Sequence, residues 1–209
     1  MDFITIKKAI ETEIVEKKSR FIANLFPVES VKEAEKLIGD SKKKYHDARH
    51  NCIAYRIIEN NQIIEKSSDD GEPSGTAGAP MLTILQKNHL VNVLIVVTRY
   101  FGGVLLGTGG LVRAYSDSLL KAIEESERVE KCQGIELLVR LEYSELEKFK
   151  YYCRNHNILI TNTEYSEWVT CNIELEDEKK EKLEKDFETK DIILKDIQEI
   201  TKKYITKSI

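Results

Sequence analysis

The chain lacks the features that mark membrane-spanning and exported proteins. Its longest strongly apolar run is Leu90–Val97, which Asn92 interrupts, whereas a membrane-spanning helix needs roughly 20 apolar residues. The start of the chain holds neither an apolar core of signal-peptide length nor a small-residue cleavage site. We therefore expect a cytoplasmic protein.

Cysteine is scarce, and no Cys-x-x-Cys pair occurs. The four cysteines are scattered at Cys52, Cys132, Cys153 and Cys171. Their spacing argues against both a zinc ribbon and a disulfide framework. Strand-like neighbours around Cys52 and Cys171 predict small, buried, apolar side chains instead.

An excess of basic residues is missing as well. The formal net charge is −4, whereas proteins that bind nucleic acid usually carry a net positive charge or a concentrated basic stripe. Any contact with nucleic acid is therefore expected from a local patch. The run Lys42–Lys44 followed by Arg49 is the best such patch, although runs of this kind are also typical of solvated helix ends.

Glycine, by contrast, is concentrated in one region. Eight of the ten glycines and two of the three prolines lie between Gly71 and Gly110, where strongly apolar segments interrupt them. Glycines clustered around ordered elements usually mark positive φ angles or close backbone approach. We therefore interpret this region as part of a folded domain and not as a linker.

Hydrophobic periodicity predicts an N-terminal domain over residues 1–129. Ser30 followed by Glu33 is a capping box that begins a helix, and the apolar run Val93–Val97 is typical of a central strand buried on both faces. The predicted strands cover about 10–17, 20–27, 50–59, 62–67 and 93–97. The predicted helices cover about 31–45, 77–88 and 111–127.

The pattern restarts after a boundary near 128–132 and predicts a second domain over residues 130–209. A second capping box, Ser144 with Glu147, predicts the start of a helix. The remaining expected elements are strands near 158–165, 168–176 and 191–204 and a helix near 177–189. The order βαββαβ is that of the ferredoxin-like split unit, so the predicted fold class is α+β in two domains.

The segment Thr98–Tyr115 leads from a buried strand through glycines into a helix. A helix N-terminus presents unpaired N–H groups and the positive end of the macrodipole, both of which suit an anion. Arg99 and Arg113 flank this turn and can donate charge-assisted hydrogen bonds to a phosphate or carboxylate. The predicted anion-binding residues within the turn are Gly107, Thr108, Gly109 and Gly110.

Known nucleotide motifs do not describe this glycine segment. Gly102-x4-Gly107 is followed by Thr108 and no lysine, which excludes a Walker loop, and the dinucleotide fingerprint does not fit either. The other interpretation is that these glycines only let a helix and a strand pack closely.

An acidic turn with Asp69, Asp70 and Glu72 precedes a Pro–Ser–Gly stretch. Three carboxylates in four positions could support binding through a hard cation, or could accept hydrogen bonds from arginines or backbone. Asp, Gly, Pro and Ser also all favour turns and helix caps. No second cluster of metal ligands is found, so neither a metal nor a cofactor is expected.

Histidine and cysteine near residue 50 allow two catalytic interpretations. His46 and His50 have the i, i+4 spacing that can hold a metal on a helix, but the predicted helix ends near Tyr45, so they are expected to point apart. His50 with Cys52 is a potential nucleophile pair, but Cys52 lies in a predicted strand, where cysteine is usually inert.

Four segments together resemble the YigZ/IMPACT family. They are Lys18–Ala23, Ala48–Arg56, Ser68–Pro80 and Thr98–Tyr115. The phrases DDGEPSGTAGAP and TRYFGGVLLGTGGLVRAY are long and specific, and they show no departure from the family pattern.

The resemblance implies an N-terminal domain with the left-handed βαβ fold seen in a ribosomal small-subunit protein and in elongation factor G. It also implies a C-terminal ferredoxin-like domain similar to the last domain of elongation factor G. Eukaryotic relatives restrain a starvation-activated kinase through an additional N-terminal domain. Residue 20 already belongs to the shared domain, so we do not carry kinase regulation over, and no catalytic residues are transferred.

The leading hypothesis is a non-enzymatic, translation-linked regulator that binds RNA or the ribosome through its N-terminal domain. Arg20 and Arg49 in the shared segments join Arg99 and Arg113 as the expected contact residues. The alternative is an enzyme or binding protein for a small phosphorylated ligand held at the glycine-rich helix start. A third hypothesis is a protein adaptor that docks through the C-terminal domain.

Overall fold

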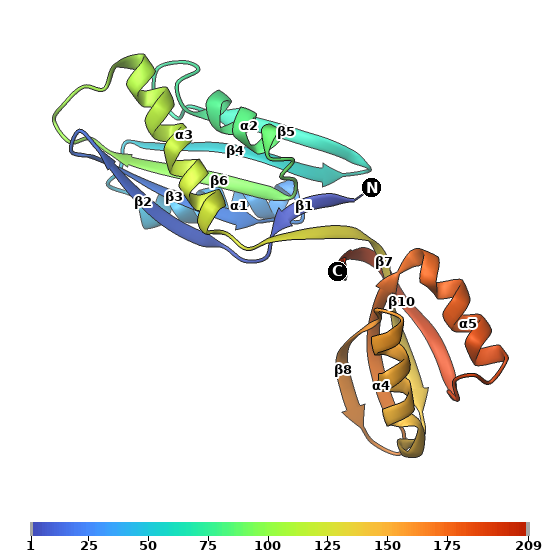
Figure 1. Ribbon diagram of the computed structural model, residues 1–209. Coiled ribbons are helices and arrows are strands. Elements are labelled where there is room, and N and C mark those ends of the chain that lie inside the picture. Colours follow the sequence, from blue (N-terminus) through green and yellow to red (C-terminus); the bar gives the residue numbers. More distant parts are fainter. Residues whose placement is uncertain (1, 208–209) are drawn as a thin grey trace. The chain divides into compact units, whose positions relative to one another are not determined.

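The computed structural model describes residues 2–207, and these divide into two compact units (Figure 1). One unit spans Phe3–Val129, and the other comprises Asp2 and the chain from Glu130 onward. The elements of the first unit are β1 (Phe3–Ile6), β2 (Ile10–Glu16), β3 (Ser19–Pro27), α1 (Val31–Lys44), β4 (His50–Glu59), β5 (Gln62–Ser68), α2 (Gly78–Lys87), β6 (Val93–Tyr100) and α3 (Gly107–Glu125). They are followed by β7 (Arg128–Leu141), α4 (Leu146–Asn155), β8 (Leu159–Tyr165), β9 (Val169–Glu176), α5 (Lys180–Glu188) and β10 (Asp196–Thr206).

An antiparallel sheet in the order β2-β3-β6-β4-β5 forms the framework of the first unit. Its central strand β6 is buried along Val93–Arg99, as the continuous apolar run predicted. The side chain of Ser30 accepts a hydrogen bond from the Glu33 backbone N–H at 3.2 Å, so the predicted N-cap of α1 is confirmed. This cap fixes where the chain leaves β3 and turns back over the sheet.

Helices cover both faces of this sheet (Figure 1). On one face α1 packs through Ala34 and Ile38 against Ile53 and Val96, within one apolar cluster. On the other face α2 and α3 share a larger cluster with the inward side chains of β3, β4 and β6. Alternate residues of each strand therefore supply two separate cores.

The two crossovers in this unit have opposite hands. The α1 crossover joins β3 to β4, the α2 crossover joins β5 to β6, and each pair flanks one intervening antiparallel strand. The second crossover starts from a strand of opposite direction, steps across the sheet the opposite way and uses the opposite face. An odd number of reversals changes the hand, so one of the two crossovers is left-handed. About 98% of such crossovers in proteins are right-handed.

The second unit is ferredoxin-like, as the order βαββαβ predicted. Its strands pair antiparallel in the order β8-β9-β7-β10. The alternating residues of β7 are buried under α4 and α5 in a single core. That core includes Ile135, Leu137, Val139, Leu141, Leu146, Phe149, Cys153 and Leu183.

Several boundaries differ from the sequence-based expectation, and three of them have a clear physical reason. Helix α3 begins at Gly107 and not at Leu111, because Leu111, Ala114 and Tyr115 anchor it in the core and carry the glycines into its first turn. Ser144 does not cap α4, because a 3₁₀ turn at Tyr143–Glu145 precedes that helix. Strand β10 begins at Asp196, because Ile192 and Leu194 pack into the core before pairing starts.

All four cysteines are free and buried, as expected for small apolar side chains. Strand β1 was not predicted from the sequence; its Ile4 forms a short parallel bridge with Leu90. Among residues 2–207, no helix combines the length and apolarity needed to cross a membrane.

Candidate functional site

The four segments singled out in the sequence meet at one end of the N-terminal sheet. Arg20, at the start of β3, pairs with Tyr100 at the end of β6, and His50, at the start of β4, pairs with Arg99. Ser68, at the end of β5, pairs with Ile53 and leads directly into the acidic turn. We call this region the sheet-end site. It comprises the hairpin turn Lys17–Arg20, Arg49, the turn Asp69–Glu72, the loop Phe101–Leu106, the helix start Gly107–Gly110 and Arg113.

A buried polar network lies beneath this site. Arg99 Nη1 donates to Glu72 Oε1 at 2.7 Å, and the Tyr115 hydroxyl donates to the same oxygen at 2.8 Å. All three side chains are buried, and burial holds the pKa of Tyr115 far above its usual value. Two residues predicted to serve a ligand, Arg99 and Glu72, are therefore paired with each other.

Asp69 caps the start of α2 from a distance. Its carboxylate accepts hydrogen bonds from the backbone N–H groups of Gly75 at 2.8 Å, Ala77 at 2.9 Å and Gly78 at 2.8 Å. Partial burial alone raises the pKa of Asp69, but these three bonds outweigh it and hold the pKa below its usual value. The carboxylate thus satisfies N–H groups that the helix cannot satisfy itself.

Asp70 is engaged by the protein in the same way. It accepts from the Asn51 backbone N–H at 2.7 Å and from Lys42 Nζ at 2.7 Å. Each carboxylate of the acidic turn consequently has protein donors, and residues 2–207 contain no group of three His, Cys, Asp or Glu side chains placed to hold a metal.

Cys52 and His50 contact the same turn without forming a nucleophile pair. The Cys52 thiol donates to the Asp69 carbonyl at 2.9 Å, and burial raises the pKa of Cys52 to about 12. His50 Nδ1 lies 2.9 Å from the Asp70 carbonyl oxygen. A neutral thiol held against a carbonyl is a poor nucleophile at neutral pH.

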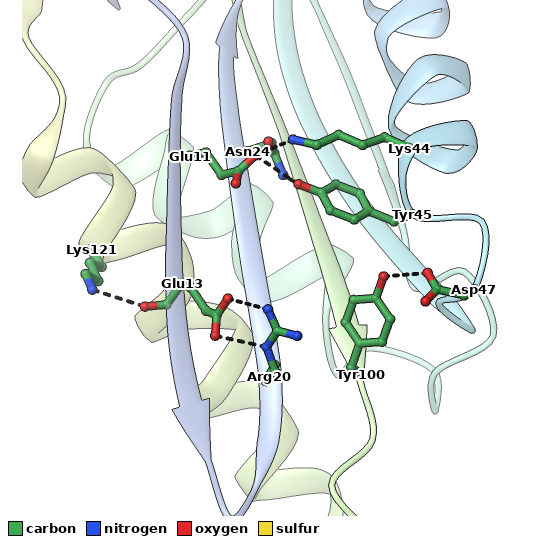
Figure 2. A network of polar contacts seen from close by, with 9 residues as sticks. All are labelled: Glu11, Glu13, Arg20, Asn24, Lys44, Tyr45, Asp47, Tyr100 and Lys121. Atoms are coloured by element: carbon green, nitrogen blue, oxygen red, sulfur yellow. Dashed lines mark hydrogen bonds and ion pairs between the residues drawn. The ribbon is translucent and has the colours of Figure 1, made fainter.

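Arg20 is exposed but already occupied. Figure 2 shows its guanidinium facing Glu13, to which Nε and Nη2 donate at 3.0 and 2.8 Å. The same group lies 5.6 Å from the centre of the Tyr100 ring, whose hydroxyl donates to Asp47 at 2.7 Å. Glu13 therefore balances the charge of Arg20. The pair holds β2 and β3 together and adds little positive potential to the surface.

The glycine loop lies against the β2–β3 hairpin. Gly102 N–H donates to Ser19 Oγ at 3.1 Å, and a side chain at Gly102 would collide with the backbone of Lys18. Lys17 and Lys18 form the hairpin turn with positive φ angles of 46° and 67°, which residues other than glycine seldom adopt. Two exposed lysines are thereby fixed beside the loop.

Exposed apolar side chains occupy the tip of the same loop. Leu105 is 84% exposed, Phe101 56% and Val104 41%. Leu106 precedes α3 without a side-chain cap, so the N–H groups of the first turn keep no capping partner. Arg49 and Arg113 are also exposed, and neither forms an ion pair with a residue in the range 2–207.

Sequence reasoning found the glycines and arginines but missed the exposed apolar tip and the Lys17–Lys18 turn. The only available signal was a Lys–Lys pair between two alternating strands, without the Asn–Gly that such turns favour. Apolar residues next to glycine are too common in buried loops to indicate exposure.

These features define a two-domain α+β protein in which an open antiparallel sheet is followed by a ferredoxin-like unit. Comparison with known proteins gives a match to the Impact N-terminal domain over residues 17–123. A second match, over residues 139–188, is to a domain of unknown function, DUF1949. The chain belongs to the IMPACT family.

Individual relatives extend the similarity over most of the chain. IMPACT family member YvyE of Bacillus subtilis is 44% identical over 83% of this chain and 78% of its own length. IMPACT family member YigZ of Escherichia coli is 35% identical over 76% of this chain and 78% of its own. A crystal structure of a hypothetical protein, 29% identical, covers 96% of this chain and 98% of its own with a TM-score of 0.63.

Proposed function

We propose that this IMPACT family protein is a cytoplasmic, non-enzymatic, translation-linked regulator that binds RNA or the ribosome through the sheet-end site. The observation that supports this proposal is a set of four exposed cations on the segments that meet at the sheet-end site, together with one exposed aromatic side chain. The cations are Lys17, Lys18, Arg49 and Arg113, and the aromatic residue is Phe101. Lysine and arginine contact phosphates, and an exposed ring can stack on an unpaired base.

The start of α3 adds a phosphate-binding element to this surface. Its uncapped N–H groups and positive dipole end suit an anion, and Arg113 lies in the second turn of the same helix. Because Arg20 and Arg99 are neutralised by Glu13 and Glu72, binding depends on the four other cations. About four phosphate contacts give a slope near −3 in log affinity against log salt concentration.

The exposure of the site favours a large partner over a small one. Small-ligand sites usually enclose about 70–90% of the ligand surface. Leu105, Phe101 and Val104 instead stand out from the loop. A small phosphorylated ligand at Gly107–Gly110 is the alternative, and it needs only the helix start and no apolar loop tip.

The test is co-sedimentation with ribosomes and fluorescence anisotropy with single-stranded RNA at low salt. We expect Arg49→Glu/Arg113→Glu to weaken binding at least tenfold. The matched control is Lys36→Glu/Lys87→Glu, which makes the same charge change at exposed lysines elsewhere in the unit and should bind like the unmodified protein. Arg99→Ala is unsuitable because it breaks a buried ion pair.

Two outcomes would overturn the proposal. The first is no association with ribosomes or RNA at low salt. The second is thermal stabilisation by nucleotides or sugar phosphates that Gly109→Val abolishes, with RNA binding absent, which would support the small-ligand alternative.

A further inference from the structure

The second unit exposes one edge of its sheet with little protection. Strand β8 pairs only with β9 among the strands described, so the backbone groups along its outer side face no other strand. Its seven residues, LITNTEY, include a single charged side chain, Glu164, and its pairing with β9 is irregular only between Ile160 and Asn162. Exposed edges are usually protected by charges, proline or covering segments, because they offer backbone groups to any extended chain.

The opposite edge is protected, which makes the difference informative. Strand β10 carries Glu199, Lys202 and Lys203, and all three form ion pairs within the unit. Charged side chains along β10 disfavour pairing of another strand with that edge. Of the two edge strands β8 and β10, β8 is thus the one with an almost uncharged sequence.

A groove runs alongside β8, between that strand and α4. It encloses about 500 Å³, and its apolar lining comes from Cys153, Ile158, Leu159 and Ile160. The other wall consists of Glu147, Lys150 and Arg154, which lie three and four residues apart and therefore on one face of α4. Lys150 Nζ donates to Glu147 at 2.8 Å, so the wall keeps one net positive charge.

We propose that β8 and this groove bind an extended segment of a partner protein that adds a strand to the sheet. Main-chain hydrogen bonds to the open edge of β8 supply affinity, and alternate side chains of the segment enter the groove. The apolar lining selects aliphatic side chains, and the positive wall selects carboxylates. The fitting partner is an extended segment whose groove-facing side chains, at every second position, include both aliphatic and acidic residues. This interaction lies in the second unit and does not depend on the function proposed for the first.

The experiment uses the full chain and two fluorescein-labelled seven-residue peptides with threonine at every second position. The positions between the threonines hold valine and aspartate in one peptide and valine and lysine in the other. We expect the aspartate peptide to bind at low salt at least tenfold more tightly than the lysine peptide. Lys150→Glu/Arg154→Glu should reverse this preference. The matched control, Lys148→Glu/Lys185→Glu, changes two exposed lysines outside the groove and should leave the preference unchanged.

Hydrogen exchange tests the strand addition without any substitution. We expect the aspartate peptide to slow amide exchange within Leu159–Tyr165 and to leave β10 unchanged. Absence of binding, or binding equal for both peptides, would overturn the proposal. So would a stable dimer in ultracentrifugation whose β8 amides are already protected without peptide, because a second copy would then occupy the edge.

Discussion

Arg99 and Glu72 form a buried ion pair across 27 residues of chain, with an Nη1–Oε1 distance of 2.7 Å. Their side chains are only 8% and 3% exposed. Glu72 lies before α2, Arg99 lies near the end of β6, and Tyr115 of α3 donates to the same carboxylate. The pair therefore joins the acidic turn, the central strand and the helix that together support the sheet-end site.

Removing Glu72 should destabilise the protein severely. Glu72→Gln leaves the Arg99 guanidinium buried without a counter-charge, and such losses cost about 3–5 kcal/mol. The measurement is the free energy of unfolding in urea. The control is Glu13→Gln, which breaks an exposed pair with Arg20 and should cost less than about 1 kcal/mol. Equal losses would contradict a special role for the buried pair.

Gly102→Ala tests the contact between the glycine loop and the hairpin. The added methyl group meets the backbone of Lys18, which cannot move as a side chain tip can. Forcing such an overlap typically costs about 1–3 kcal/mol. Gly109→Ala is the comparison, because nothing lies within 4 Å of its added Cβ and alanine favours helix. The midpoint temperature of thermal unfolding should fall for Gly102→Ala and stay equal or rise for Gly109→Ala.

The hydrogen bonds to the Asp69 carboxylate should make the protein less stable in acid than at neutral pH. The folded-state pKa of Asp69 lies below the unfolded value of about 3.9, so its contribution is fully present above that value and is lost as pH falls toward the folded pKa. Asp69→Asn should be less stable than the unmodified protein at pH 7, and the difference should shrink below about pH 4. Urea unfolding between pH 7 and 3 measures this, with the exposed Asp117→Asn as control. A difference independent of pH would mean that the lost stability does not come from the charged carboxylate.

The cysteines should be unreactive in the folded protein. Burial raises the pKa of Cys52 and that of Cys153 to about 12, and it raises those of Cys132 and Cys171 as well. At pH 8 only about one thiol in ten thousand with such a pKa is ionised. We expect slow alkylation by iodoacetamide in native buffer and complete alkylation in urea. Rapid alkylation of Cys52 that His50→Ala slows would revive the nucleophile pair.

Much of the fold could be predicted because burial follows sequence period. The continuous run of β6 and the alternation in β7 each reflect one environment repeated along the strand. The start of α3 could not be predicted, because Gly109 and Gly110 have low helix propensity and Gly107 has a positive φ of 69°. Only the packing of Tyr115 and its neighbours in the core holds this turn helical.

The segments of the candidate site could be predicted from the sequence, but the pairings of their side chains could not. The sequence picked out the segments that meet at the sheet end, but it does not reveal that Arg99 meets Glu72 or that Arg20 meets Glu13. Those pairings depend on which strands become neighbours. They leave Lys17, Lys18, Arg49 and Arg113 as the cations available to a partner, two of which sequence reasoning had not selected.

The glycines at the start of α3 also set how that helix end responds to contact. Gly109 and Gly110 each cost about 1 kcal/mol relative to alanine in a helix, so the first turn is the part of α3 that unwinds most easily. The amides best placed to hold an anion are therefore the least firmly ordered ones in the helix. Binding of the proposed anion there would be coupled to ordering of this first turn, whose entropic cost would limit affinity and permit rapid release.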